Sequence, residues 1–295
     1  MSQSLADLLP GSQGGGRIRV WLKSSAYTTR LLLGEAGDPW ESAAQYLAWF
    51  SQAHGLLRPD VAVVEVGELY DSWLARHPDL RAELGAKRRL SYPLRKLLEP
   101  EAPRAVLAEV LEAVAAHLRG QVPLVLAMPS PRAWLYRANL LAGRSDVELD
   151  ADGIEDAAMY VADVLRAVSH LPVSGLLLEE DSACAGQGAI DAELYRPLLN
   201  VAHHYRWAVA MRLGLKPLRV WPAAAEVQAV IGSPALLDGA SQAGGVDVGS
   251  DLWSGQAVPA LGATQFYFAE VPRAHRPELV LETLERLRAG AAVEI

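Results

Sequence analysis

Short apolar runs alternate with longer amphipathic stretches along most of the chain, and this alternation constrains the fold more than any other feature. Strands are expected at 17–23, 60–66, 122–129, 173–180, 218–222, 234–239 and 264–271. Helix-like patterns lie between them, such as "PRAVLAEVLEAVAAHLRG" and "PELVLETLERLRAG". Apolar strands separated by helices are typical of a parallel sheet that is buried on both faces.

Seven such strand-plus-helix units predict an α/β fold, a single (β/α)8 TIM barrel. An eighth strand is expected within the more polar segment 244–255. An open doubly wound sheet is the alternative, but the first strand is not followed by the Gly-x-Gly-x-x-Gly turn of a dinucleotide site. We therefore expect one barrel domain over 16–295, preceded by a flexible, glycine-rich lead-in at 1–15.

The composition narrows the class of protein. The net charge of −8 argues against non-specific binding to nucleic acid. No run approaches the roughly 18 apolar residues of a membrane span, and the first residues lack the pattern of a secretory signal. The single cysteine, Cys184, excludes an intramolecular disulfide and a multi-cysteine metal site. We expect a cytoplasmic protein that acts without nucleic acid, membrane, metal or cofactor.

Polar residues follow most of the expected strands. In a parallel barrel the carboxyl ends of all strands meet at one face, where active sites are found. The residues that we expect at this face, in chain order, are Lys23, Ser24, Ser25, Tyr27, Arg30, Glu65, Glu68, Ser130, Arg132, Glu179, Glu180, Asp181, Asp238, Glu270, Arg273 and His275. Their convergence predicts a site for a small molecule.

Three consecutive acids, Glu179, Glu180 and Asp181, end the apolar run "GLLLEED". Because successive strand residues point to opposite faces, Glu179 and Asp181 are expected to share one direction and Glu180 the other. A partly desolvated carboxylate beside another acid has a raised pKa and suits general acid or base catalysis. The alternative is that these acids bind backbone amides or pair with nearby arginines.

The segment 74–104 is rich in arginine and lysine, although the chain as a whole is acidic. A long insertion after a barrel strand often forms a lid over the site, so we predict a lid-like insertion here. Its basic side chains, with Lys23 and Arg132, would attract a carboxylated or phosphorylated molecule. The alternative is a solvated helical face.

Four further residues have weaker signals. Trp253 lies in a glycine-rich stretch and is expected either to stack on a ligand or to belong to a cover loop. The adjacent His203 and His204 diverge by about 100 degrees on a helix, which favours structural roles over joint metal binding. Cys184 has no nearby base in sequence and is expected to be a minor contact.

Both ends of the chain resemble known barrel enzymes. The opening "IRVWLKSSAYTTR" resembles the first strand and loop of uroporphyrinogen decarboxylase-type barrels. The closing "FYFAEVPRAHRPELVLETLERL" resembles the last unit of cobalamin-independent methionine synthase, a member of the same superfamily. The methionine synthase branch implies zinc held by histidine and cysteine, which a chain with one cysteine and no His-x-Cys pair does not match. The decarboxylase branch implies arginines and an acid that hold carboxylates without a cofactor.

The sequence therefore predicts a metal-free, decarboxylase-like lyase that acts on a small anionic molecule by acid–base catalysis. The expected catalytic residues are Glu179, Asp181, Glu270, Tyr27 and His275, and the expected substrate-binding residues are Lys23, Arg30, Ser130, Arg132, Asp238 and Trp253. The alternatives are a methyl- or alkyltransferase domain that works with a corrinoid-carrying partner, and a non-catalytic small-molecule-binding barrel. A homodimer is expected from the resemblance.

Overall fold

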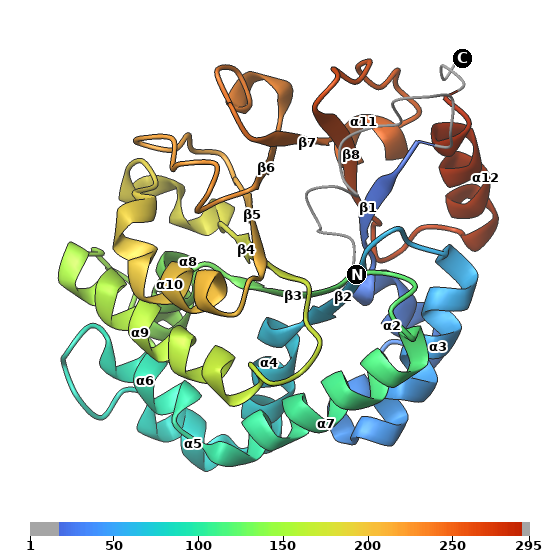
Figure 1. Cartoon of the computed structure of the whole chain (residues 1–295). Helices are drawn as coiled ribbons and strands as arrows, with labels where there is room; N and C mark the ends of the chain where they lie inside the picture. Colours follow the sequence, from blue (N-terminus) through green and yellow to red (C-terminus); the bar gives the residue numbers. More distant parts are fainter. Residues whose placement is uncertain (1–17, 291–295) are drawn as a thin grey trace.

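A computed structural model of the chain describes residues 18–290, and eight parallel strands form its centre (Figure 1). The strands are β1 (Val20–Lys23), β2 (Ala62–Glu65), β3 (Leu124–Pro129), β4 (Gly175–Glu179), β5 (Ala208–Arg212), β6 (Ala229–Gly232), β7 (Ala243–Asp247) and β8 (Gln265–Glu270). The predicted (β/α)8 barrel is confirmed. The predicted lead-in at 1–15 lies outside the described residues.

The sheet is a nearly closed barrel with one seam. Its strand order is β1-β8-β7-β6-β5-β4-β3-β2, so β1 and β2 are its two edges. We call the gap between these two strands the seam. The backbone N–H of Val20 donates to the Asp60 carboxylate at 2.9 Å and so links the two edges through a side chain. The seam is therefore a place where the barrel wall is held by side chains.

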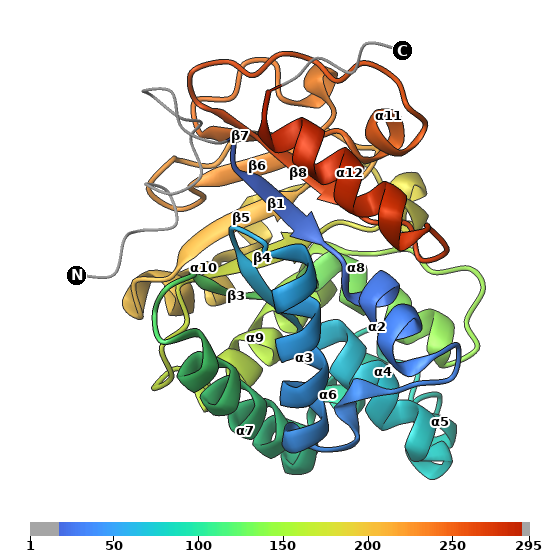
Figure 2. The ribbon, with the colours of Figure 1, turned by 90° about the vertical axis from the view of Figure 1, so that its right-hand side faces the viewer.

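Helices cover mainly the first half of the barrel (Figures 1 and 2). They are α2 (Ser25–Leu33), α3 (Ala43–Leu57), α4 (Val66–Arg76), α5 (Pro78–Glu83), α6 (Tyr92–Leu98), α7 (Glu101–Leu118), α8 (Pro131–Leu141), α9 (Ala151–Ala167), α10 (Arg196–His204), α11 (Gly249–Trp253) and α12 (Pro277–Arg288). Side-chain caps begin three of them: Ser42 accepts from the N–H of Gln45, Ser130 from Ala133, and Asp150 from Gly153. Between β5 and β7, the only helix in the described chain is a short 3-10 helix, η4 (Pro234–Leu236).

The structure corrects two of the expected strands. Segments 218–222 and 234–239 are not strands: Val220 is 67% exposed, and η4 occupies the second segment. The true fifth and sixth strands, β5 and β6, lie in alanine-rich stretches whose sequence predicts helix. Tertiary burial overrides that local preference. The expected extra strand is confirmed as β7, within 244–255 apart from its first residue.

The barrel interior is filled unevenly. Trp21 on β1 stacks near Phe266 on β8, with ring centroids 6.3 Å apart, and Phe268 lies 6.4 Å from Trp21. Facing strands contribute smaller residues such as Ala210 and Ile231. Gly245 on β7 gives the large rings room: a methyl group there would lie 2.6 Å from Ile231 and 2.7 Å from the Phe266 ring.

We expect Gly245→Ala to destabilise the protein by about 1–3 kcal/mol, because the new methyl group overpacks the interior. The measurement is urea unfolding of both proteins. Gly232→Ala on β6 is the matched control, since its methyl group would lie 3.4 Å from its nearest neighbour, an ordinary contact distance. Equal stabilities for the two variants would contradict this account of the interior.

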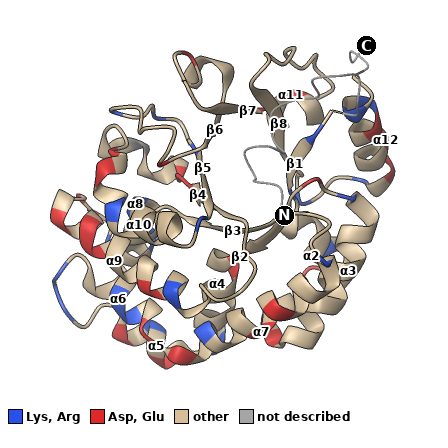
Figure 3. Cartoon of the chain, viewed as in Figure 1, with Lys and Arg blue, Asp and Glu red and all other residues tan. Residues whose placement is uncertain are grey.

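The basic segment 74–104 lies along the outer helical layer. Its helix α6 packs against α8 and α9. Arg89 pairs with Asp156 of α9 at 2.7 Å, and the Leu90 carbonyl accepts from Asn139 of α8 at 3.0 Å. Figure 3 shows basic residues on α6 and on the loop that precedes it. These contacts fix the segment to the side of the barrel, and its role as a lid stays a prediction.

Candidate active site

Six of the eight strands end on a charged residue. These residues are Lys23, Glu65, Glu179, Arg212, Asp247 and Glu270. Each follows an inward-facing residue by two positions, as Lys23 follows Trp21 and Arg212 follows Ala210, so all six face the barrel axis. We call these six residues the strand-end network.

One half of the network surrounds Lys23. Its ammonium forms a close ion pair and hydrogen bond with Glu179 and lies 3.8 Å from the Glu65 carboxylate. The three residues come from β1, β4 and β2, so side chains from distant parts of the sequence meet here. The convergence of Lys23 and Glu179 that the sequence predicts is present in the structure.

The other half of the network surrounds Arg212. Its guanidinium contacts Glu179 at 3.2 Å, Asp247 at 3.0 Å and Glu270 at 2.7 Å, and lies 4.6 Å from the centre of the Phe268 ring. Glu179 thus joins the two cations. Sequence reasoning missed Arg212 and Asp247 because it placed β5 in a helix and left β7 undefined. A signal for both residues is present in the sequence: each is a charged residue at the end of a short apolar run, two positions after a small residue.

Burial and neighbouring charges shift the pKa values of Glu65 and Lys23 in the network. Burial raises the pKa of Glu65 well above its usual range; the charge of Lys23 opposes this rise, and that of Glu179 adds to it. Burial by itself would lower the pKa of Lys23, but Glu65 and Glu179 together raise it. The result is an ammonium group beside a carboxyl group that binds its proton more tightly than an ordinary glutamate does.

A second acid lies next to Glu65. Burial also raises the pKa of Glu68, which sits in the first turn of α4, while a hydrogen bond from Ser25 opposes the rise. Both acids were expected at this face, and Glu65 is only 6% exposed. The β1 and β2 ends therefore carry two carboxyl groups with raised proton affinity.

Ser130, Arg132 and Glu180 lie in a separate buried cluster, which we call the Glu180 cluster. The Tyr195 hydroxyl donates to Glu180 at 2.5 Å, and its oxygen lies 3.3 Å from the Ser130 hydroxyl oxygen. Arg132 lies 3.8 Å from Glu180 and donates to backbone carbonyls of the loop after β4 at 2.8 and 3.1 Å. The structure thus corrects the expectation that Arg132 and Lys23 clamp one anion together. Glu180 points to the opposite face of β4 from Glu179, and Arg132 lies beside Glu180, whereas Lys23 lies beside Glu179.

Four other expected residues lie outside the strand-end network. Asp181 is exposed and caps the 3-10 helix Ser182–Gln187 by accepting from the Ala183 N–H at 2.8 Å. Asp238 is exposed on the loop after η4. Arg30 donates to the Arg273 carbonyl at 3.1 Å. Tyr27 is 1% exposed, and its hydroxyl has no hydrogen-bond partner within 18–290.

Two expected residues adjoin Glu270 at the end of β8. The indole N–H of Trp253 donates to the Glu270 carbonyl at 2.6 Å, and its ring lies 5.3 Å from the His275 ring. These three residues therefore share one part of the barrel rim. Their catalytic and binding roles stay predictions.

Comparisons with known proteins bear on the fold. No protein-family model matches the sequence, and no curated protein matches it. Among solved structures, a methyltransferase from Methanosarcina mazei is similar, with a TM-score of 0.53 at 11% identity over 93% of this chain and 94% of that one. At this identity the likeness shows a shared barrel fold. Within 18–290 no helix is long and apolar enough to cross a membrane.

Proposed function

We propose that this chain is an enzyme that transfers a methyl or other small alkyl group, with Glu65 as the proton donor. The observation that carries the proposal is the strand-end network, in which a buried carboxyl group with a raised pKa lies 3.8 Å from Lys23. A general acid works best when its pKa lies near the operating pH. The structural likeness to a methyltransferase supports group transfer as the reaction type.

The reaction that we propose breaks the bond between a heteroatom of the donor and its alkyl carbon. The heteroatom keeps the bonding electron pair and takes the proton of Glu65, while the alkyl carbon bonds to a nucleophilic acceptor. The carboxylate left on Glu65 is stabilised by the adjacent Lys23 ammonium. Glu179 holds Lys23 and Arg212 in place during this change.

We propose that the acceptor of the alkyl group is a reduced corrinoid, and that a partner protein carries it. Leu215 and Val220, in the segment after β5, are 72% and 67% exposed, more than the other large apolar residues described. The backbone of this segment forms hydrogen bonds with the backbone of Ile190, which lies in the loop after β4, so the segment adjoins that loop. Exposed apolar side chains at such a place suit contact with another protein.

A lyase that acts on a carboxylated molecule is the second candidate, and the observation that favours it is the pair of cations Lys23 and Arg212. Both cations already contact carboxylates: Glu179 binds the two of them, and Asp247 and Glu270 bind Arg212. An anionic substrate would have to compete with these groups, whereas a neutral donor would not. The network therefore suits alkyl transfer from a neutral donor better.

The test is an assay of the full chain with cob(I)alamin and a panel of small alcohols, ethers and thioethers. Nuclear magnetic resonance would follow loss of the donor and formation of its dealkylated product. A parallel panel of small carboxylic acids would be assayed for released carbon dioxide. We expect turnover of a donor in the first panel.

Three results would overturn the proposal or part of it. Carbon dioxide release without alkyl transfer would establish the lyase instead. Saturable binding with no product in either panel would indicate a non-catalytic barrel. Turnover that is unchanged in Glu65→Gln would remove Glu65 from the reaction, with Glu112→Gln, an exposed glutamate of α7, as the control for general effects of the substitution.

A further inference from the structure

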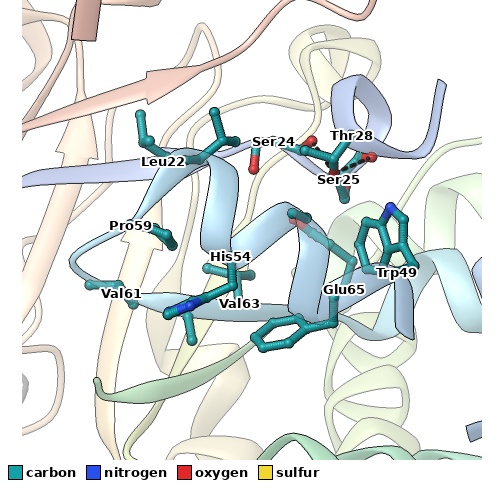
Figure 4. Close-up of a pocket in the computed structure, with 14 residues that line it drawn as sticks. Leu22, Ser24, Ser25, Thr28, Trp49, His54, Pro59, Val61, Val63 and Glu65 are labelled. Atoms are coloured by element: carbon teal, nitrogen blue, oxygen red, sulfur yellow. Dashed lines mark hydrogen bonds between the residues drawn. The ribbon is translucent and has the colours of Figure 1, made fainter. Parts of the chain in front are cut away.

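A small cavity lies at the seam between β1 and β2, beside the strand-end network. We call it the seam cavity; its volume is about 40 Å³. Leu22 and Val63 provide apolar walls (Figure 4), and Phe50 and Ala53 of α3 add to them. Because β1 and β2 are the sheet edges, the cavity occupies the place where an eighth strand pairing would otherwise close the wall.

Buried polar groups line part of the seam cavity, among them the Trp49 indole, the Glu65 carboxyl group and the His54 ring, whose Nε2 has no hydrogen-bond partner among the described residues. Trp49 of α3 is 4% exposed, and its indole N–H has no hydrogen-bond partner among the described residues. Figure 4 shows the indole nitrogen on the ring edge nearer to Ser25 and Thr28, and the Glu65 carboxyl group extending toward Ser24 and Ser25. A buried donor left without an acceptor costs free energy, so an acceptor is missing on this side.

The volume limits what can supply that acceptor. One water requires roughly 10–15 Å³ measured in this way, so the cavity has room for roughly three waters or for an organic molecule of a few heavy atoms. Apart from the His54 ring, the opposite end is lined by the apolar residues Phe50, Ala53, Leu57 and Val61, which favour an apolar group over water. An amphiphilic molecule with one polar end fits this division better than water alone.

We propose that the seam cavity binds a short-chain alcohol or ether, with its oxygen between the Trp49 N–H and the Glu65 carboxyl group. The indole can only donate, so the ligand needs an acceptor. A carboxylate would face Glu65 and Glu68, and an ammonium group would offer the indole no acceptor and would lie beside the charge of Lys23. A neutral oxygen avoids both penalties.

Glu65 lines the seam cavity and also belongs to the strand-end network. The ligand oxygen would therefore lie next to the group that we assign as proton donor. That the ligand is the alkyl donor rests on the proposed function, whereas its binding does not.

The experiment uses the full chain labelled with ¹⁵N at its tryptophan indoles and titrated with 1-propanol, propionate and propylammonium. Comparison with Trp49→Phe assigns the Trp49 signal. We expect 1-propanol to shift this signal saturably and the two ions to leave it unchanged. Ala53→Leu, which fills the cavity from its apolar side, should abolish the shift, and Trp73→Phe on α4, outside the cavity, should preserve it.

Binding to Trp49→Phe is followed by saturation transfer to 1-propanol, and we expect about fivefold weaker binding from the loss of one hydrogen bond. A Trp49 signal that does not move with 1-propanol, or that moves equally with all three molecules, would overturn the site. Binding without alkyl transfer would leave the site standing and overturn the proposed function. Turnover by a protein whose Trp49 signal never responds would do the reverse.

Discussion

Replacing Arg212 by methionine is expected to destabilise the protein by about 2–4 kcal/mol at neutral pH, because three carboxylates lose their shared cation. Glu179, Asp247 and Glu270 all lie within 3.2 Å of this guanidinium, whose side chain is 20% exposed. Urea unfolding measures the loss.

The control for this substitution is Arg219→Met. Arg219 is 71% exposed and pairs with Asp191 at 3.3 Å. An exposed pair of this kind contributes roughly 0–1 kcal/mol, so little change is expected. Equal effects for the two variants would show that the strand-end network is not an interacting unit.

Glu65→Gln is expected to lower turnover about 10²- to 10⁴-fold, because the amide keeps the shape of the side chain and removes its acidic proton. The pKa of Glu65 is raised in the folded protein. The wild-type rate should therefore stay high at pH values below that raised pKa and fall as the pH rises through it. The assay is the donor turnover described above, measured across pH, and the residual rate of Glu65→Gln should lack this fall.

The same pKa shift has a consequence for stability, and its sign can be checked in the same pair of proteins. The folded state binds the Glu65 proton more tightly than the unfolded chain does, so this contribution is present at low pH and is lost as the pH rises through the raised pKa. Glu65→Gln should unfold with less alkaline destabilisation than wild type. If the activity of Glu65→Gln keeps the pH profile of the wild-type protein, Glu65 is excluded as the acid.

The barrel was predictable from the sequence because its apolar runs and helical patterns have distinct periods. The strands in the second half were harder, since β5 reads "AVAMR" directly after a helix. A left-handed backbone conformation at Arg206 (φ 58°) separates α10 from β5, and no sequence pattern marks this break. Alanines at 208 and 210 favour a helix locally but are needed inside a barrel that large aromatic rings already fill.

The site was predictable where strand ends were identified and not elsewhere. Lys23, Glu65, Glu179 and Glu270 end correctly placed strands and do meet. Arg212 belongs to a strand that the sequence places in a helix, and Asp247 to a strand whose bounds the sequence leaves open. Asp181 was assigned by extending the alternation of β4 beyond its last residue, where the chain turns into a 3-10 helix. Arg132 follows a correctly placed strand, but it lies beside Glu180, which points to the opposite face of β4 from Glu179. Patterns in a single sequence do not show which of these two acids Arg132 will contact.

The central claim is that Glu65 binds its proton more tightly than an ordinary glutamate while it lies beside Lys23. Side-chain carboxyl nuclear magnetic resonance on ¹³C-glutamate-labelled protein tests it most directly. The account predicts a carboxyl signal that titrates well above the ordinary glutamate range and is missing from Glu65→Gln. A Glu65 signal that titrates with the exposed glutamates would contradict it.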